Sequence, residues 1–263
     1  MPLPATEGND REVSIPHLAG GVARLLAGVL SEPRAAAPRP SVTEPRAAAP
    51  RPSVTEPRAA APRPSLTEPR AEWLYVFGHG AGAGMRHPFM ADIAAGLAAR
   101  GIASLRWEQP ALTAGRRIGD RPVVVEPMAR SACEFARALR PEARLLAGGK
   151  SMGGRMTSLA ASKAPLVGVE ALVLLGFPLH PAGRPAVSRA EHLAAVGLPL
   201  LFVSGTRDAL ADITLLRAEV GRLSRAQMIE IVGADHGLAL PKRAGVDPIA
   251  TACDAVAMFV AGI

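Results

Sequence analysis

Short apolar segments alternate with segments of helical periodicity along most of this 263-residue chain. Eight segments have the pattern of strands: 13–17, 22–30, 73–77, 103–107, 144–147, 171–175, 200–204 and 228–232. Six have the pattern of helices: 88–99, 127–139, 152–164, 190–196, 210–223 and 248–260. This alternation is typical of a mostly parallel sheet with helices on both faces. We therefore expect an α/β fold with about eight strands, and the 49% of apolar residues can supply a large core.

The sequence shows neither a membrane span nor a secretory signal. The longest apolar run, 171–179, contains Gly176 and Pro178 and is much shorter than the roughly 18 residues that a spanning helix needs. The first eleven residues carry Glu7, Asp10 and Arg11 in place of a basic start and an apolar stretch. We expect a cytoplasmic protein that does not bind a membrane.

A proline- and arginine-rich tract separates the second and third expected strands. From 32 to 70 the sequence repeats with a period of twelve, as in TEPRAAAPRPSV. Prolines every few residues exclude helices and central strands, and one Val or Leu per repeat offers too little apolar surface for stacked repeats. We interpret 32–70 as an extended insertion. Residues 1–31 then supply N-terminal strands, and 71–263 the main part, of one domain.

The net charge of +7 raises the question of nucleic-acid binding, but the tract alone supplies +3 of it. Its glutamates dilute the positive charge, and no aromatic residue is interleaved with the arginines. We expect a tolerated insertion and no nucleic-acid partner. A salt-sensitive mobility shift that disappears on deletion of 32–70 would indicate the opposite.

Only two cysteines occur, Cys133 and Cys253, and each lies in an apolar pattern of helical period. Two thiols cannot form a disulfide framework or a four-cysteine zinc site. We expect both to be core residues, and we expect no metal or other cofactor.

The sequence GKSMG, from Gly149 to Gly153, directly follows an expected strand and opens an expected helix. A serine in G-x-S-x-G on such a strand-to-helix turn is typical of a nucleophile, because the flanking glycines let the backbone turn sharply. Ser151 is therefore the candidate nucleophile. The same letters resemble the end of a phosphate-binding P-loop, but the first glycine of that motif would have to stand where the sequence has Arg144.

A nucleophilic serine needs a base, and the base needs a carboxylate to orient it. Asp208 and His236 each follow an expected strand by a few residues, at the sheet edge where α/β proteins place their sites. Asp235 is a second candidate for the acid, but it adjoins His236 in one loop and has less freedom to reach the ring. The structural alternatives are a helix-capping Asp208 and a loop-closing His236.

The glycine-rich segment 78–84 follows the expected strand 73–77. Acyl transfer needs two backbone N–H groups directed at the developing oxyanion, and we assign these to Ala81 and Met152. A dinucleotide-binding loop is the alternative, but there the helix would begin at the glycines, whereas here it is expected near Pro88.

Several basic residues near Ser151 have either a binding or a structural role. Lys150 is a candidate base, but adjacent side chains diverge on a sharp turn, so we expect a structural ion pair. Arg155, one helical turn after Ser151, is a candidate for holding an anionic group of a substrate. Four arginines near strand ends are candidates for the same binding role: Arg106, Arg116, Arg117 and Arg207. For these four and for Arg155 we favour structural pairing with carboxylates such as Asp120 and Glu108.

Three histidines are candidates for the pocket wall. His79 lies in the glycine-rich segment, and His180 and His192 lie between the expected strands 171–175 and 200–204. For His180 and His192 we favour the alternative, that their ring nitrogens are satisfied by structural hydrogen bonds.

Five blocks of sequence, in order, resemble one family: GHGAGAGMRH (78–87), GGKSMGGRM (148–156), GFPLHP (176–181), GTRDALA (205–211) and ADH (234–236). They are similar to small α/β hydrolases related to dienelactone hydrolases, a family that includes bacterial predicted hydrolases and the α/β-hydrolase-like domain of eukaryotic chromatin-complex proteins. The resemblance covers 13–263 apart from the tract. It implies the α/β-hydrolase fold, with Ser151, Asp208 and His236 at the triad positions. The segment RWEQP (106–110) departs from the aromatic-Pro pair usual in this family.

These observations together predict a serine hydrolase acting on a small ester or thioester. His236 would deprotonate Ser151, Asp208 would orient His236, and the N–H groups of Met152 and Ala81 would stabilise the oxyanion. Only one helix fits between 175 and 200, so we expect no large lid and a small-molecule substrate. The alternative is a non-catalytic interaction module or scaffold on the same fold, although a scaffold has no need to retain all three residues.

Overall fold

The computed structural model describes residues 9–19, 22–33, 71–116, 120–241 and 245–263. The interpretation of the repeat as an extended insertion falls almost entirely on 34–70, outside the described residues, and so does the expected role of Arg117. In the described part of the chain, no helix combines the length and the apolar character needed to cross a membrane.

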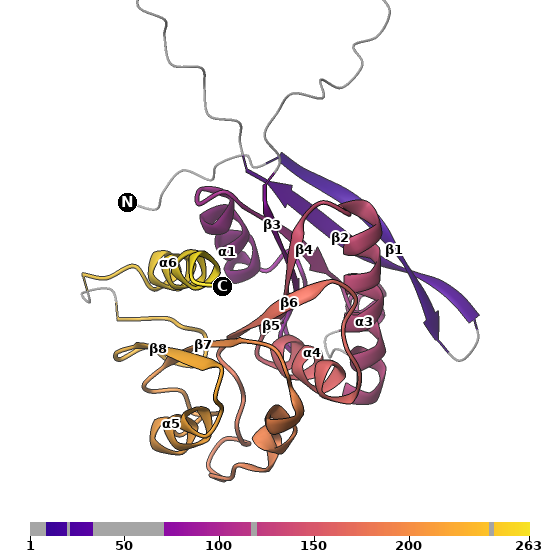
Figure 1. Ribbon diagram of the computed structural model, residues 1–263. Helices are drawn as coiled ribbons and strands as arrows, with labels where there is room; N and C mark the ends of the chain where they lie inside the picture. Colours follow the sequence, from indigo (N-terminus) through magenta and orange to yellow (C-terminus); the bar gives the residue numbers. More distant parts are fainter. Residues whose placement is uncertain (1–8, 20–21, 34–70, 117–119, 242–244) are drawn as a thin grey trace, which may run out of the picture.

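Eight strands form one open, mostly parallel sheet in the order β1-β2-β4-β3-β5-β6-β7-β8 (Figure 1). Among the strands of the described residues, only the pairings of β1 with β2 and of β2 with β4 are antiparallel. The strands are β1 (Asn9–Ala19), β2 (Val22–Glu32), β3 (Trp73–Gly78), β4 (Ile102–Trp107), β5 (Arg144–Lys150), β6 (Val169–Leu175), β7 (Leu200–Gly205) and β8 (Ala226–Ile231). All eight expected strands and the α/β fold class are therefore confirmed.

Helices cover both faces of this sheet, with α1 and α6 on one face and α3 and α4 on the other (Figure 1). Residues of α5 and of the 3-10 helix η1 join the core on the side of α3 and α4. The helices are α1 (Pro88–Ala98), α2 (Pro110–Thr113), α3 (Pro122–Leu139), α4 (Met152–Lys163), η1 (Ser188–Ala195), α5 (Ile213–Gly221) and α6 (Pro248–Ala261). Only η1 lies between β6 and β7, so no large lid is present there.

Two helix starts differ from expectation for local reasons. Helix α3 starts five residues early because Pro122, with its preset φ, occupies the first turn, and Pro127 is tolerated inside it. Helix α5 starts at Ile213, not at Leu210, because the Asp212 carboxylate accepts hydrogen bonds from the first N–H groups of the helix. The segment expected as the fourth helix is 3-10 (η1), and the short α2 was not expected.

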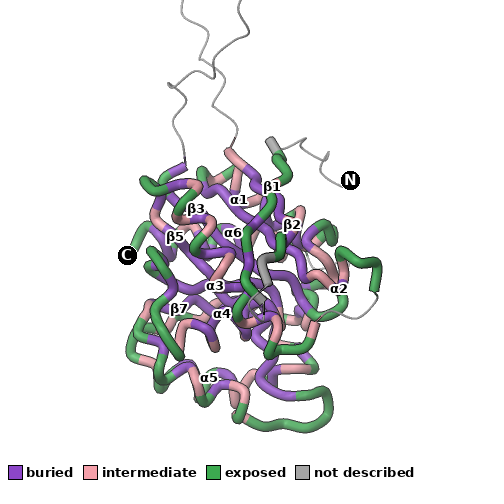
Figure 2. The backbone as a smooth tube through the Cα atoms, turned by 90° about the vertical axis from the view of Figure 1, so that its right-hand side faces the viewer, coloured by how far each residue is buried: buried purple, intermediate pink, exposed green. Residues whose placement is uncertain are grey.

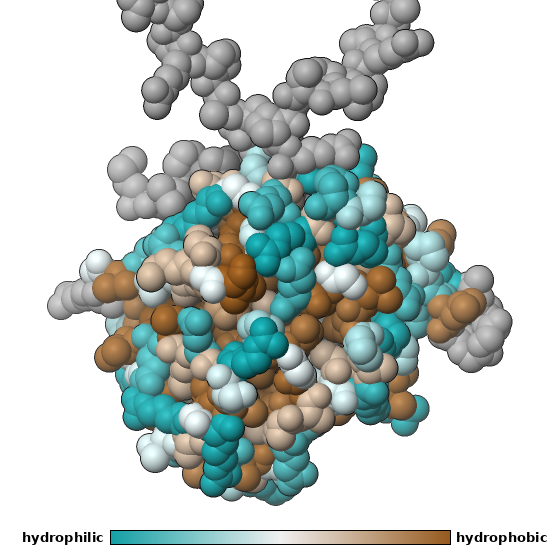
Figure 3. Space-filling model, in the orientation of Figure 1, coloured by the Kyte–Doolittle hydropathy of each residue, from teal (hydrophilic) through white to brown (hydrophobic). Residues whose placement is uncertain are grey.

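Two buried apolar clusters, one on each side of the sheet, form the core, and the buried central strands are visible in Figure 2. Cys133 belongs to one cluster and Cys253 to the other, which confirms them as core residues. Burial raises the pKa of each thiol to about 12. Polar and apolar side chains are interspersed over the face shown in Figure 3, as is usual for a folded domain.

Glu32, at the start of the proline- and arginine-rich tract, and Ala71, which follows the tract, meet at one buried arginine. Arg140 donates from Nη1 to Glu32 Oε1 at 2.5 Å and from Nη2 to the carbonyl of Ala71 at 3.2 Å. Glu32, expected as the first residue of the insertion, is instead the last residue of β2. The boundary of the N-terminal hairpin therefore lies one residue later than the repeat pattern indicated.

Candidate active site

Ser151 occupies the tight turn between β5 and α4. Its backbone has φ 51° and ψ −115°, outside the regions that non-glycine residues usually adopt, and its N–H donates to the carbonyl of Leu175 at 2.9 Å. The turn is close-packed: a Cβ on Gly153 would overlap the backbone carbonyl of Gly78 in β3. The glycine thus lets α4 start directly against the sheet, and the partly exposed Ser151 stands at the carboxyl edge.

A continuous hydrogen-bonded chain joins Ser151 to His236 and Asp208. His236 Nε2 lies 2.9 Å from Ser151 Oγ, and His236 Nδ1 lies 2.8 Å from Asp208 Oδ2. The three residues follow β5, β7 and β8, whose carboxyl ends lie at the same edge because these strands are parallel. The three residues singled out from the sequence are therefore brought together.

Of the two candidate acids, Asp208 and not Asp235 contacts His236, and the two differ in burial. The Asp208 side chain is inaccessible to solvent, and its second oxygen accepts the N–H of Leu210 at 2.7 Å. Asp235 is exposed, and its Oδ1 accepts the N–H of Ala239 at 2.9 Å. The helix-capping role considered for Asp208 belongs to Asp212 instead.

The glycine-rich loop after β3 lies beside this chain. Strands β3 and β5 are parallel neighbours with Gly78 opposite Gly149, and a Cβ on Gly80 would lie 3.5 Å from Ser151 Cβ. Within the described residues, no acceptor is hydrogen-bonded to the N–H of Ala81 or Met152. Two unpaired backbone donors are thus available close to Ser151.

Lys150 does not form the expected ion pair with any described carboxylate. Its Nζ donates to the backbone carbonyl of His236 and lies 5.6 Å from the centre of the Phe89 ring. Burial lowers the pKa of Lys150 to about 8, although Asp208 and Asp235 act in the opposite direction. The ammonium group therefore anchors the loop that carries His236, a contact that the sequence analysis missed.

Arg155 also lacks the expected carboxylate partner among the described residues. The side chain is partly buried, and its Nε is inaccessible and without a hydrogen bond. Burial, followed by the positive charge of Arg189, lowers the pKa of Arg155. The pairing expectation does hold for Arg116, which lies 3.7 Å from Asp120, and Arg106 pairs with Asp10 at 2.6 Å.

The three candidate histidines of the pocket wall have structural partners. His180 Nδ1 bonds the carbonyl of Pro181 at 2.8 Å, and its Nε2 accepts the N–H of Asp212 at 2.7 Å. His192 Nε2 lies 2.7 Å from Ser158 Oγ, and burial together with Arg155 lowers the pKa of His192 to about 4. His79 is fully buried behind the glycine-rich loop and so does not line an open pocket. Its partners, Glu108 and Gln109, belong to the RWEQP segment. The departure of this segment from the family pattern was the one sequence signal that could have indicated a structural role for His79.

A metal site is not evident in the described part of the chain, where no three or more His, Cys, Asp or Glu side chains gather in a suitable group. The chemistry available at the carboxyl edge is that of a hydroxyl, an imidazole, a buried carboxylate and free N–H groups.

Comparisons with known proteins agree with this architecture. A family profile described as "Alpha/beta hydrolase domain" matches residues 71–261. The fold is similar to that of an esterase domain from Rhodothermus marinus, with a TM-score of 0.62, 17% identity and coverage of 96% of this chain and 98% of that chain.

Two further solved structures share the fold. A dienelactone hydrolase from Anabaena variabilis has a TM-score of 0.61 and 19% identity, with 96% of each chain covered. An α/β serine hydrolase without lid from Xanthomonas campestris has a TM-score of 0.62 and 16% identity, with 98% of each chain covered. On the strength of the profile match and the eight-stranded fold, the chain belongs to the α/β-hydrolase family.

Proposed function

We propose that this protein is a serine hydrolase that cleaves a small carboxylic ester or thioester through an acyl-enzyme. The observation that carries the proposal is the continuous chain from Asp208 through His236 to Ser151, with distances of 2.8 and 2.9 Å. Because the buried Asp208 carboxylate accepts the Nδ1–H of His236, Nε2 presents its lone pair to the Ser151 hydroxyl. This is the tautomer that a general base requires.

In the first half-reaction, His236 Nε2 takes the proton of Ser151 as Oγ forms a bond to the carbonyl carbon of the substrate. The carbonyl oxygen becomes an oxyanion that accepts hydrogen bonds from the N–H groups of Met152 and Ala81. The intermediate then expels the alcohol or thiol, which receives the proton from His236 and leaves an acyl ester on Ser151. The charge of Asp208 stabilises the imidazolium formed in between.

In the second half-reaction, His236 deprotonates a water molecule that attacks the acyl carbon. The second tetrahedral intermediate releases Ser151 Oγ, which regains its proton from His236, and the free carboxylic acid leaves. The Lys150 hydrogen bond to the carbonyl of His236 keeps the loop after β8 in place through both steps.

The unpaired Arg155 supports a preference for substrates with an anionic group. A partly buried guanidinium without a carboxylate partner gains hydrogen bonds and loses charge repulsion when a carboxylate or phosphate binds. Arg155 lies one helical turn from Ser151, and long side chains on a helix lean toward its N-terminus. The short connection through η1 leaves the site open to small substrates.

A screen of purified protein against short-chain p-nitrophenyl esters and acyl thioesters tests the proposal. We expect turnover of at least one class, abolished in Ser151→Ala. A folded wild-type protein that hydrolyses none of them would favour the alternative, a non-catalytic interaction module or scaffold with this fold.

A further inference from the structure

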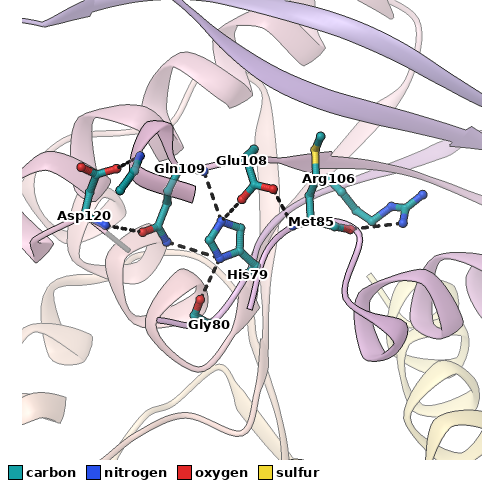
Figure 4. Close-up of polar contacts among 8 residues, drawn as sticks. His79, Gly80, Met85, Arg106, Glu108, Gln109 and Asp120 are labelled. Carbon is teal, nitrogen blue, oxygen red and sulfur yellow. Dashed lines mark hydrogen bonds and ion pairs between the residues drawn. The ribbon is translucent and has the colours of Figure 1, made fainter. Parts of the chain in front are cut away.

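A buried polar cluster lies directly behind the glycine-rich loop, with His79 at its centre (Figure 4). His79 Nδ1 lies 2.7 Å from the carbonyl oxygen of Gly80. On the other side of the ring, Nε2 accepts the backbone N–H of Gln109 at 3.2 Å and lies 2.7 Å from Glu108 Oε1. The ring is fully inaccessible, so these contacts fix its orientation.

The partners of His79 determine where its protons lie. The carbonyl of Gly80 can only accept, so Nδ1 must carry a hydrogen and donate it. Nε2 accepts the N–H of Gln109, so it presents its lone pair and carries no hydrogen of its own. Glu108 Oε1 lies 2.7 Å from Nε2 but is buried without a hydrogen-bond partner in the described part of the chain. The two hydrogen bonds of the ring, to the carbonyl of Gly80 and from the N–H of Gln109, therefore fix the tautomer with its hydrogen on Nδ1.

The Gly80 carbonyl belongs to the same peptide unit as the N–H of Ala81. A trans peptide is planar, and its C=O and N–H point in opposite directions. A hydrogen bond that pulls the Gly80 carbonyl toward the interior thus turns the Ala81 N–H outward, on the loop where Gly80 adjoins Ser151. The orientation of this donor depends on the protonated Nδ1.

The far end of the glycine-rich loop is held by residues at the end of β4 and directly after it. Glu108 Oε2 accepts the N–H of Met85 at 3.1 Å, and Arg106 Nη1 donates to the carbonyl of Met85 at 3.3 Å (Figure 4). A Cβ on Gly84 would come within 2.7 Å of Glu108 Oε2, so the loop packs tightly on this carboxyl group. Glu108 thus contacts both His79 and the end of the loop at Met85.

We propose that His79 is a positioning residue that orients the Ala81 N–H toward the oxyanion, and that the backbone N–H of Gln109 and the neighbouring Glu108 carboxyl group hold the His79 ring in the orientation that this requires. This inference rests on the proposed hydrolase function. It assigns a role to the segment 106–110, which departs from the family pattern.

Replacement of His79 by Ala and by Asn separates positioning from packing. The Asn amide can donate to the Gly80 carbonyl from nearly the place of Nδ1, whereas Ala cannot. With a p-nitrophenyl ester that the wild type cleaves, we expect kcat of His79→Ala to fall at least about tenfold with KM little changed, since loss of a whole oxyanion donor costs about 10²- to 10³-fold. We expect His79→Asn to recover most of kcat. Equal kcat in wild type and His79→Ala would overturn the proposal.

Glu108 provides a second pair of variants should His79→Ala fail to fold. The amide oxygen of Glu108→Gln can still accept the N–H of Met85 and so hold the end of the loop, whereas Glu108→Leu cannot. We expect Glu108→Gln to keep kcat within about threefold and Glu108→Leu to lose about tenfold or more, both with thermal unfolding monitored. Equal kcat in two folded Glu108 variants would contradict the role of Glu108 in holding the loop.

Two controls separate this inference from the proposed function. Labelling of wild-type Ser151 by a fluorophosphonate tests the function itself, without reference to His79. In the unmodified protein, ¹H–¹⁵N correlation of the imidazole rings reports on the ring nitrogens of His79 directly. We expect a slowly exchanging Nδ1–H; an unprotonated Nδ1 in an enzyme that is labelled and active would overturn the inference and leave the hydrolase proposal intact.

Discussion

His236 Nε2 lies 2.9 Å from the hydroxyl of Ser151, although 85 residues separate the two in the sequence. Their strands, β5 and β8, are themselves separated in the sheet by β6 and β7. The contact therefore depends on the loop after β8 reaching back across the carboxyl edge. The bond from Lys150 Nζ to the carbonyl of His236 ties this loop to the residue next to Ser151. Stability and the proposed catalysis are thus coupled at Lys150.

The packing of the turn around Ser151 predicts different costs for two glycine substitutions. In Gly153→Ala the new methyl group meets the backbone of Gly78, which cannot recede because β3 is a central strand. We expect a loss of about 3 kcal/mol of unfolding free energy. Gly82→Ala, in the neighbouring loop, has no atom within 4 Å and should change stability by less than about 0.5 kcal/mol. Urea unfolding of both variants checks this, and similar losses in the two would contradict the tight contact.

Burial of Lys150 predicts a pH-dependent stability. Its pKa falls from 10.5 to about 8 on folding, so between these values the unfolded chain binds more protons than the folded one. Stability conferred by position 150 should therefore rise with pH above about 8, by up to ~3 kcal/mol. Urea unfolding from pH 7 to 10 should show this rise for the wild type relative to Lys150→Met.

The comparison with Lys150→Met is needed because other buried groups titrate in the same range. The thiols of Cys133 and Cys253 have pKa values raised from 9.0 to about 12, so they oppose folding as pH rises through 9. The thiols lower the stability equally in wild type and variant, so the difference in unfolding free energy between the two proteins reports on Lys150 alone. Parallel stability curves would contradict a buried, charged Lys150 at neutral pH.

The unpaired guanidinium of Arg155 predicts substrate selectivity. For the monoester of a dicarboxylic acid, Arg155→Gln should raise KM about tenfold, because a charge-assisted hydrogen bond is lost, and should leave the KM of a neutral ester of equal length unchanged. The matched control is Arg116→Gln, at an exposed arginine paired with Asp120. An equal effect of Arg155→Gln on both esters would show that it acts on packing and not on charge.

The meeting of Glu32 and Ala71 at Arg140 predicts that the repeat can be removed. Replacing 34–70 by a linker of about four glycine or serine residues should preserve the fold, since one guanidinium holds both ends close together. A shorter loop should add stability, at most about 2 kcal/mol. Differential scanning calorimetry should give an equal or higher Tm. A variant that fails to fold would show that the tract is an integral part of the domain.

The strands and the grouping of the candidate site residues could be predicted because they depend on local pattern and chain order. Each strand is a short apolar run, and the parallel order brings the residues that follow β5, β7 and β8 to one edge. Helix starts were less predictable where two candidate caps compete: Asp208 and Asp212 both precede α5, and only the tertiary contact of Asp208 with His236 decides between them.

The roles of Lys150, Arg155 and His79 could not be predicted, because each depends on a partner that the sequence does not place. Lys150 bonds a main-chain carbonyl, which any residue could supply. Arg155 is distinctive because no carboxylate among the described residues pairs with it. His79 depends on Gln109, whose N–H it accepts, and on Glu108 at 2.7 Å; both residues directly follow the neighbouring strand β4 and lie about 30 positions away in the sequence.

The proposed nucleophile is tested most directly by labelling the purified protein with a fluorophosphonate probe, in parallel with Ser151→Ala and His236→Ala. Because His236 Nε2 contacts the Ser151 hydroxyl, we predict strong labelling of the wild type, none of Ser151→Ala and a large loss in His236→Ala, with all three proteins folded by circular dichroism. A folded wild-type protein that remains unlabelled, or labelling that persists in Ser151→Ala, would contradict the assignment of Ser151 as an activated nucleophile.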